Sequence, residues 1–222
     1  MTLLTRTSAL HAEASAAVPA ELLQLLQTTK RIWVIPHERP DADALGAALG
    51  LQSILTQRGA EVAVFCADAP AKVYDVIPTI DRVLTSPPEW TPDAVILVDC
   101  GEARRAGRAG ALMEALPSSV TRATIDHHVS NSSTSPLQWI DPTAAATCEM
   151  ITLIAVALGS DLAAEEGRLA ATLAAGIIMD TATFQHSNTT PRTLQVAGLL
   201  LEAGAPISEI SRRLYRSKPA TQ

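Results

Sequence analysis

The sequence predicts an α/β fold, with a doubly wound, mainly parallel five-stranded sheet flanked by helices and a helical C-terminal part. Over the first two thirds of the 222 residues, short apolar runs alternate with helix-like segments, the pattern of successive β-α-β units. Hydrophobic residues make up 47% of the chain and aromatic residues only 3%, so aliphatic side chains must fill the core. This composition is typical of helices packed on a buried parallel sheet.

Five apolar runs are predicted to form the strands. They cover residues 31–36, 61–66, 83–84, 94–99 and 122–126, and the run at 83–84 is interpreted as a short edge strand. Helical spacing of apolar residues predicts helices over 19–30, 43–58 and 109–116, with Gly59 ending the second of them. After Pro142, four more helices are predicted over 145–158, 163–178, 193–203 and 207–215.

Charge and cysteine content narrow the class of protein. The formal net charge of −6 argues against a broad basic surface for long duplex nucleic acid, although bound cations could reverse the local field for a small phosphate-bearing substrate. The three cysteines form no C-x-x-C pair, so a reduced, cytoplasmic setting is expected. We expect neither a signal peptide nor a membrane span. Residues 1–17 are rich in Ala, Ser and Thr and are expected to form a flexible N-terminus.

Acidic and imidazole side chains stand at or just after four of the apolar runs. They are His37, Asp41 and Asp43, then Asp99, then the triplet Asp126-His127-His128, and finally Asp180. Open parallel sheets bind ligands beyond the carboxyl ends of their strands, so these side chains are expected to converge and to hold two metal ions. Asp99 could bridge two ions about 3.5–4 Å apart. Helix capping by the aspartates, turn capping by Asp99 and a surface histidine pair remain open as simpler interpretations.

A few other polar residues near these runs have two interpretations. Arg104 and Arg105 follow Asp99 and could hold a phosphate, or form a solvated basic pair. Thr189 or Thr190 before Pro191 predicts a helix start, and plain capping is favoured over substrate contact. The remaining candidates are given structural or surface roles: His11, His186 and Cys100.

Together, the four motifs resemble those of the DHH phosphoesterase superfamily. The pattern H-x-x-x-D-x-D at 37–43 is followed by a strand-end Asp at 99, by D-H-H at 126–128 and by an Asp at 180, in the family's order. Within the superfamily, P-D-A-D-A-L-G, D-H-H-V-S-N and the stretch after Asp180 look most like the nanoRNase/pAp-phosphatase branch. The resemblance implies hydrolysis of short oligoribonucleotides, dinucleotides and 3′-phosphoadenosine 5′-phosphate.

The resemblance also implies a role for each matched residue. Two Mn²⁺ ions are expected, with Mg²⁺ or Co²⁺ as options that the ligand types leave open. The first ion would be held by His37, Asp41 and Asp99, and the second by Asp43, Asp99, His127 and Asp180. The expected catalytic residues are Asp99, Asp126 and His128. Of these, His128 would contact the scissile phosphate, with Arg105 as a second candidate for phosphate, and Asp126 would support the imidazoles.

Three features depart from the branch pattern. Ala182 stands where the branch usually has Gly, and Ala47 where it often has Ser. Residues 18–214 would form the DHH catalytic domain, and 215–222 would begin a linker to a C-terminal DHH-associated domain, whose glycine-rich, His-containing motif does not occur in this sequence. Without that domain, intact metal binding but weak substrate affinity is expected. Whether the chain forms a homodimer stays open.

Two other functions remain alternatives. A family II-type inorganic pyrophosphatase shares the D-H-H metal site and would release phosphate from pyrophosphate. A non-catalytic nucleotide-binding module would be favoured if a motif had lost a ligand, and none has. A long-strand exonuclease of the RecJ type is disfavoured because the acidic chain shows no evident single-strand groove.

Overall fold

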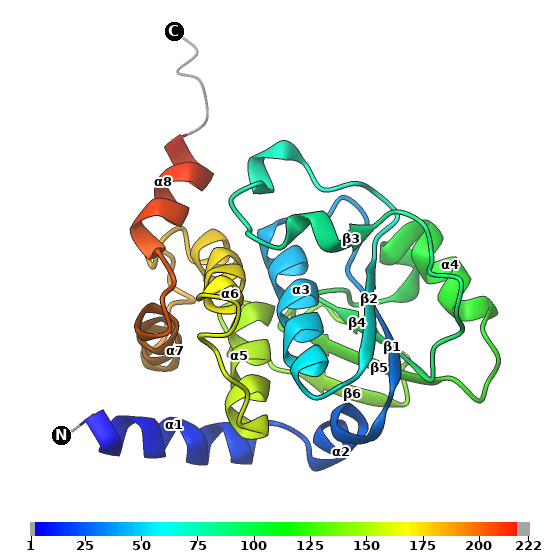
Figure 1. Cartoon of the computed structure of the whole chain (residues 1–222), viewed down its shortest axis with the longest axis horizontal. Coiled ribbons are helices and arrows are strands. Elements are labelled where there is room, and N and C mark those ends of the chain that lie inside the picture. Colours follow the sequence, from blue (N-terminus) through cyan, green and yellow to red (C-terminus); the bar gives the residue numbers. More distant parts are fainter. Residues whose placement is uncertain (1–2, 217–222) are drawn as a thin grey trace, which may run out of the picture.

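The computed structural model of the protein describes residues 3–216 and is built around one six-stranded parallel sheet (Figure 1). The strand order is β3-β2-β1-β4-β5-β6, and every neighbouring pair is parallel. The strands are β1 (Arg31–Ile35), β2 (Glu61–Phe65), β3 (Val83–Leu84), β4 (Ala94–Val98), β5 (Thr121–Asp126) and β6 (Leu137–Ile140). The predicted α/β class and the five predicted strands are confirmed.

The sixth strand, β6, is absent from the prediction. It pairs with β5 and extends the sheet at that edge, with Ile125 opposite Trp139. Only Trp139 of its four residues is buried. A short, half-exposed edge strand with a polar residue at its centre gives only a weak apolar signal in the sequence.

The two faces of the sheet pack against different helices. Successive residues of a strand point to opposite faces, so Ile32 and Val34 of β1 join the larger core cluster, whereas Trp33 and Ile35 join the smaller one. The larger cluster lies under α3 (Ala42–Gln57), α5 (Thr147–Leu158) and α6 (Arg168–Asp180), and the smaller one under α4 (Gly107–Ala115) (Figure 1). Both faces are therefore covered, as a doubly wound sheet requires.

The remaining helices lie where the sequence predicts them, apart from the first. They are α1 (Leu3–Ala17), α2 (Ala20–Thr28), α7 (Pro191–Glu202) and α8 (Ile207–Arg216), with short 3₁₀ turns η1 (Lys72–Tyr74), η2 (Ile80–Arg82) and η3 (Ala103–Ala106). The segment expected to be a flexible N-terminus forms α1, which buries Leu10 and Ala14 against the core. Of the segment expected to begin a linker, Tyr215 and Arg216 belong to α8, and 217–222 lie outside the described residues. No helix in the described part of the chain combines the length and apolar character needed to cross a membrane.

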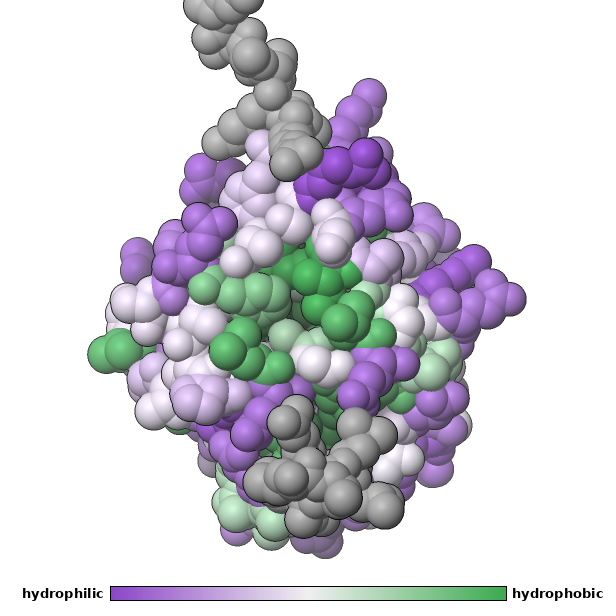
Figure 2. Space-filling view, turned by 90° about the vertical axis from the view of Figure 1, so that its left-hand side faces the viewer, coloured by the Kyte–Doolittle hydropathy of each residue, from purple (hydrophilic) through white to green (hydrophobic). Residues whose placement is uncertain are grey.

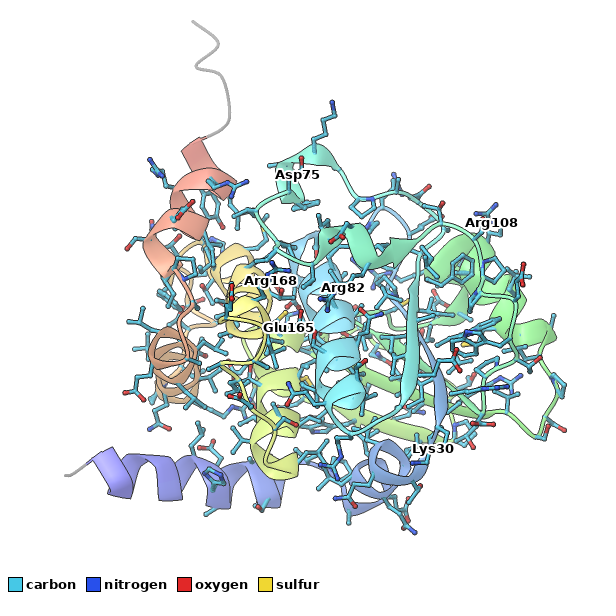
Figure 3. All side chains as sticks on the ribbon, in the orientation of Figure 1. Lys30, Asp75, Arg82, Arg108, Glu165 and Arg168 are labelled. Carbon is cyan, nitrogen blue, oxygen red and sulfur yellow. The ribbon has the colours of Figure 1, made fainter. Side chains whose placement is uncertain are left out.

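An ion pair ties the β3 side of the sheet to the loop before α6. Arg82 and Glu165 lie beside α3 in Figure 3, and Arg82 Nη1 donates to Glu165 Oε1 at 3.1 Å. Ser53 of α3 donates to the same oxygen at 3.3 Å. The backbone of Glu165 is left-handed, with φ of 56°, a conformation that costs strain in a residue other than glycine.

The side of the molecule formed by α1, α7 and α8 carries apolar residues at its surface. Figure 2 shows them gathered in a shallow hollow within a mostly hydrophilic rim. On α7, Leu194 and Leu201 are separated by two helical turns and are both more than half exposed, at 54% and 57%. The metal-ligand candidates lie elsewhere, at the ends of the strands.

Candidate metal centre

The strand order places β1 and β4 side by side at the point where the chain reverses its direction across the sheet. In doubly wound folds, ligands bind at this switch point, beyond the carboxyl ends of the strands. His37 stands two residues after β1, Asp99 directly after β4, and His127 directly after β5. Asp41 and Asp43 begin α3, and Asp180 ends α6. The fold therefore brings four separate segments of the chain to one edge of the sheet.

The first group of ligand atoms consists of His37, Asp41 and Asp99. His37 Nε2 lies 4.0 Å from Asp41 Oδ1 and 3.7 Å from Asp99 Oδ2. The other ring nitrogen, Nδ1, lies 2.7 Å from the carbonyl oxygen of Glu38, which fixes the ring with Nε2 toward the carboxylates. Asp41 also caps α3, because its Oδ1 accepts the backbone N–H groups of Asp43 and Ala44 at 3.0 Å. Helix capping and metal binding are thus compatible at Asp41.

The second group consists of Asp43, His127 and Asp180, with Asp99 adjoining it. His127 Nε2 lies 4.0 Å from Asp43 Oδ2, 3.7 Å from Asp99 Oδ1 and 3.3 Å from Asp180 Oδ2. On the opposite side of the ring, Nδ1 lies 3.3 Å from the carbonyl oxygen of Ala144. Asp99 thus faces both groups, with Oδ2 toward His37 and Oδ1 toward His127.

The backbone holds Asp99 in an unusual conformation. Its φ is 52°, a left-handed value that costs strain in most residues but is tolerated by Asp. Asp99 N–H continues the ladder by donating to the carbonyl of Ile125 at 3.0 Å, and Thr147 Oγ1 donates to Asp99 Oδ1 at 2.9 Å. Only 1% of Asp99 is exposed, so Thr147 binds a buried carboxylate, while the hydrogen bond to Ile125 holds the backbone.

Asp43 lies against the first turn of α5. Its Oδ2 accepts the N–H of Thr147 at 2.7 Å, and its Oδ1 accepts the N–H of Cys148 at 2.9 Å. Free N–H groups and the positive end of the helix dipole both favour a carboxylate at this position. Gly176 of α6 allows the close approach, because a Cβ there would lie 2.5 Å from Asp43 Oδ1.

Asp126 and His128 form a separate pair beside the ligand groups. Asp126 Oδ1 accepts from His128 Nδ1 at 2.8 Å, and Oδ2 accepts from Asn131 Nδ2 at 2.6 Å. With Nδ1 engaged, the Nε2 atom of His128 is directed away from Asp126, and the side chain is 39% exposed. His128 Nδ1 also lies 3.4 Å from Asp99 Oδ1, so the pair adjoins the ligand groups without being enclosed by them.

Burial and mutual repulsion change the pKa values of these groups. Burial, reinforced by the charges of neighbouring aspartates, raises the pKa of Asp43 and of Asp99 to about 7. Burial alone would lower the pKa of His127, but Asp180, Asp43 and Asp99 raise it to about 10. Burial would likewise raise the pKa of Asp126, yet the hydrogen bonds from His128 and Asn131 lower it. Negative charge is therefore in excess among the ligand groups, whereas Asp126 is balanced by its own partners.

These residues fit divalent cations. His127 Nε2 is buried without a hydrogen-bond partner, although three carboxylate oxygens surround it. Distances of 3.3–4.0 Å are too long for good hydrogen bonds but short enough for atoms that share one ion. Three groups of possible ligands have all their atoms within 4.8 Å of one another: His37, Asp41 and Asp99; Asp43, His127 and Asp180; and Asp99, His127 and His128. Carboxylate and imidazole donors suit Mn²⁺ and related ions.

The arginine candidates fall on η3, next to this edge of the sheet. Arg105 is exposed, and its carbonyl oxygen accepts the N–H of Glu38 at 2.7 Å, so its turn is held against the loop that follows His37. Arg104 instead pairs with Glu102 at 3.0 Å. Of the two, Arg105 is the one whose backbone is tied to a ligand-bearing loop.

The other polar candidates have mainly structural positions. Thr190 caps α7 through a capping box with Thr193, with Pro191 at the first helical position, as the sequence predicts. His186 Nδ1 lies 3.1 Å from the carbonyl oxygen of Asp180, so its ring contacts the turn after α6. Burial raises the pKa of the Cys100 thiol to about 12, which leaves it protonated and unsuited to nucleophilic attack.

Three residues that hold the ligands were not singled out in the sequence. Thr147 contacts both Asp43 and Asp99, Asn131 contacts Asp126, and Asn188 Nδ2 donates to the carbonyl oxygens of Ala145 and Asp180 at 3.0 and 3.2 Å. Asn131 had a weak signal, as the last letter of D-H-H-V-S-N. Thr147 had only its place near the start of a predicted helix, and Asn188 had none.

Known proteins are similar in sequence to this chain over most of its length. A bifunctional oligoribonuclease and PAP phosphatase of Thermus thermophilus is 32% identical over 201 residues, which cover 90% of this chain and 58% of that protein. The protein of the same description from Bacillus subtilis is 30% identical over 199 residues, covering 89% of this chain and 61% of its own length. The chain thus spans about three fifths of the length of these relatives.

Solved structures show the same fold. An exopolyphosphatase-related protein from Bacteroides fragilis superimposes with a TM-score of 0.80 at 20% identity, over 89% of this chain and 59% of that one. A Methanococcus jannaschii protein assigned to the family II inorganic pyrophosphatases gives a TM-score of 0.59 at 24% identity, over 82% and 59% of the two chains. The sequence model of the DHH family, N-terminal domain, matches residues 31–177, which carry every ligand candidate except Asp180. The chain belongs to the DHH family.

Proposed function

We propose that this chain is the catalytic part of a phosphoesterase that binds two divalent cations, preferably Mn²⁺, and hydrolyses short oligoribonucleotides and 3′-phosphoadenosine 5′-phosphate. The observation that carries the proposal is the sharing of Asp99 between two ligand groups, with one oxygen toward His37 and the other toward His127. The substrate class comes from the relatives described as oligoribonuclease and PAP phosphatase, which this chain matches over about nine tenths of its length.

The ligands divide into two sets. His37, Asp41 and Asp99 would hold one cation, and Asp43, Asp99, His127 and Asp180 would hold the other. Such cations, when bound, would lower the pKa of a bound water and would stabilise charge that develops on phosphate oxygens. The protein contributes two buried carboxylates held by hydrogen bonds, because Thr147 binds Asp99 and the first turn of α5 binds Asp43.

His128 is suited to contact the phosphate. Its Nδ1–H donates to Asp126, whose pKa is lowered, so the carboxylate stays ionised and acts only as an acceptor. The same hydrogen bond raises the pKa of His128 and favours the imidazolium form. His128 then presents Nε2–H as a charge-assisted donor toward the solvent side of the site, where it can bind a phosphate oxygen and stabilise its charge as the phosphorus–oxygen bond breaks.

Arg105 is the second candidate for holding the substrate. Its turn is attached through Glu38 to the loop that carries His37, and the guanidinium is exposed at the same edge. A guanidinium binds phosphate with two parallel hydrogen bonds, so Arg105 would orient a non-reacting phosphate of the substrate. Loss of this contact should raise KM more than it lowers kcat.

The test combines metal binding with product analysis. Isothermal titration of the metal-free protein with Mn²⁺ should give two bound ions, and Asp99→Asn should weaken both, whereas Asp81→Asn, which alters an exposed carboxylate, should weaken neither. With Mn²⁺ present, wild type should release mononucleotide from a diribonucleotide, and Asp99→Asn should not. Equal Mn²⁺ binding by wild type and Asp99→Asn would contradict the proposal.

The fold neighbour assigned to the family II inorganic pyrophosphatases makes pyrophosphate hydrolysis the second candidate. The same preparations should therefore be incubated with pyrophosphate under identical conditions. Release of phosphate from pyrophosphate, with no mononucleotide from the diribonucleotide, would replace the proposed substrate class by this one. Cleavage of the diribonucleotide alone would exclude it.

A further inference from the structure

The turn that follows Asp180 has an unusual backbone. Ala182, Thr183 and Phe184 all adopt left-handed conformations, with φ of 47°, 59° and 63°. Residues with a Cβ avoid this region, at a cost of roughly 1–2 kcal/mol each, and three in succession are rare. Such a turn persists only where surrounding contacts compensate for the strain.

Two side chains of α8 contact the chain on either side of Asp180. The Tyr215 hydroxyl donates to the carbonyl oxygens of Met179 at 2.8 Å and of Ile178 at 3.1 Å, sharing its proton between them. The Ser211 hydroxyl lies 2.7 Å from that of Thr183. Tyr215 therefore holds the last turn of α6 just before Asp180, and Ser211 holds the left-handed residues just after it.

Asp180 needs this support more than the other ligands do. It stands at the C-terminus of α6, where the helix dipole disfavours a negative charge. Asp43, by contrast, lies at the start of α3 and accepts two N–H groups from α5. His186 and Asn188 contact Asp180 only at its backbone carbonyl oxygen and not at its carboxylate.

We propose that Tyr215 and Ser211 are positioning residues, through which α8 sets the affinity of the Asp43–His127–Asp180 group for its cation. The inference rests on the proposed function to the extent that this group binds a divalent cation. α8 is anchored for the purpose by Ile210 and Leu214, which are 1% and 4% exposed and belong to the main core cluster. A change in the position of α8 would then be transmitted to one cation and not to the other.

The decisive experiment is a double-mutant cycle on Mn²⁺ affinity. Tyr215→Phe keeps the ring and removes only the hydroxyl. It should lower the affinity for one of the two Mn²⁺ ions about tenfold, the smaller of the losses seen when residues that support metal ligands are replaced. On an Asp180→Asn background the same substitution should have no further effect. On a His37→Ala background it should keep its full effect, because His37 belongs to the other group.

A matched control lies on the same helix. Ser208 of α8 is exposed, so Ser208→Ala should leave both Mn²⁺ affinities unchanged, whereas Ser211→Ala should weaken the same ion as Tyr215→Phe. Hydrogen exchange of the metal-free protein adds a readout independent of the metal. Amides of residues 181–186 should exchange faster in Tyr215→Phe, while those at the ends of β1 and β4 stay unchanged.

Each outcome separates the two proposals. If wild type binds two Mn²⁺ ions and Tyr215→Phe binds both with wild-type affinity, the positioning role is wrong and the proposed function stands. If Tyr215→Phe weakens both ions equally and also lowers the melting temperature, the residue is merely structural and the inference is again wrong. If wild type binds no Mn²⁺, the proposed function itself fails.

Discussion

At the scale of single residues, the D-H-H triplet shows how neighbours in sequence take different environments. His127 and His128 have ring centroids only 4.3 Å apart, yet Nε2 of His127 lies among three carboxylates, whereas Nδ1 of His128 is hydrogen-bonded to Asp126 and lies 3.4 Å from Asp99. The carboxylate of Asp126 accepts one hydrogen bond from His128 and another from Asn131. Successive side chains of an extended chain point to opposite sides, so adjacent histidines can contact different groups. The roles expected for the two histidines, metal binding for His127 and phosphate contact for His128, stay a prediction, although the two rings do have different partners.

Ala182 yields a prediction at this scale. It stands where the DHH branch usually has Gly, and its φ of 47° is a conformation that Gly adopts without strain. Replacing Ala182 by Gly relieves that strain, and the gain is partly offset by the greater freedom of Gly in the unfolded chain. We expect Ala182→Gly to raise the free energy of unfolding by about 0.5–1 kcal/mol, measured by urea denaturation of the metal-free protein.

The same substitution elsewhere provides the control. Ala111 is an exposed residue within α4, where Gly is less favourable than Ala by about 1 kcal/mol. Ala111→Gly should therefore lower the free energy of unfolding, so the two substitutions should change this free energy in opposite directions. If both destabilise the protein equally, the left-handed turn after Asp180 carries no strain that Gly can relieve.

At the scale of elements, the site depends on how closely α3 and α6 approach each other. A Cβ at Gly176 of α6 would lie 2.8 Å from the Cα of Asp43, and one at Gly46 of α3 would lie 2.8 Å from the carbonyl oxygen of Thr172. Both distances are shorter than real Cβ contacts, and backbone atoms cannot move aside as a flexible side chain can. The two glycines are therefore required by the approach of the helices.

Gly176→Ala should separate the helices and displace a ligand. The added methyl would lie 2.5 Å from Asp43 Oδ1, so we expect a loss of about 1–3 kcal/mol in the free energy of unfolding and weaker Mn²⁺ binding at the Asp43 group. Denaturation and Mn²⁺ titration of the same preparation would measure both. Gly198 of α7 is the matched control, because nothing lies within 4 Å of a Cβ there and Gly198→Ala should stabilise α7. Unchanged Mn²⁺ affinity in Gly176→Ala would contradict the expected displacement.

Elements also show where prediction from sequence succeeds and where it fails. The buried strands β1 and β4 are continuous apolar runs, and their final polar residues could be assigned to one edge because parallel strands end together. β6 lacks such a run, so it is missing from the predicted strands. The apolar residues of α1 show only weak helical periodicity, so a flexible segment is predicted there instead of a helix. The contacts of Thr147 depend on the start of α5 meeting Asp43, a packing contact more than 100 residues apart in sequence that no local pattern records.

At the scale of the whole molecule, the site concentrates negative charge beside a mainly apolar core. Burial and neighbouring aspartates raise the pKa of Asp43 and Asp99 to about 7, well above the ~4 of an unfolded chain. In the metal-free protein, the protonated forms of these two carboxyl groups favour the folded state. Their contribution to stability is fully present below about pH 4 and is lost as the pH rises through 7. His127, with a pKa raised to about 10, adds a contribution that is present below its unfolded pKa and lost as pH rises through 10. Both effects have the same sign.

Bound cations should reverse this dependence, because the ligands bind a metal in their deprotonated forms. We expect the rise in melting temperature caused by Mn²⁺, measured against EDTA, to grow from pH 5 to pH 8. Each ion should add about 2.7 kcal/mol when its free concentration is a hundred times its dissociation constant. In Asp99→Asn, which removes the shared carboxylate, the rise should be small at every pH. A rise in wild type that is the same at pH 5 and pH 8 would mean that the buried aspartates do not exchange protons for the metal, and the charge cluster would then need another explanation.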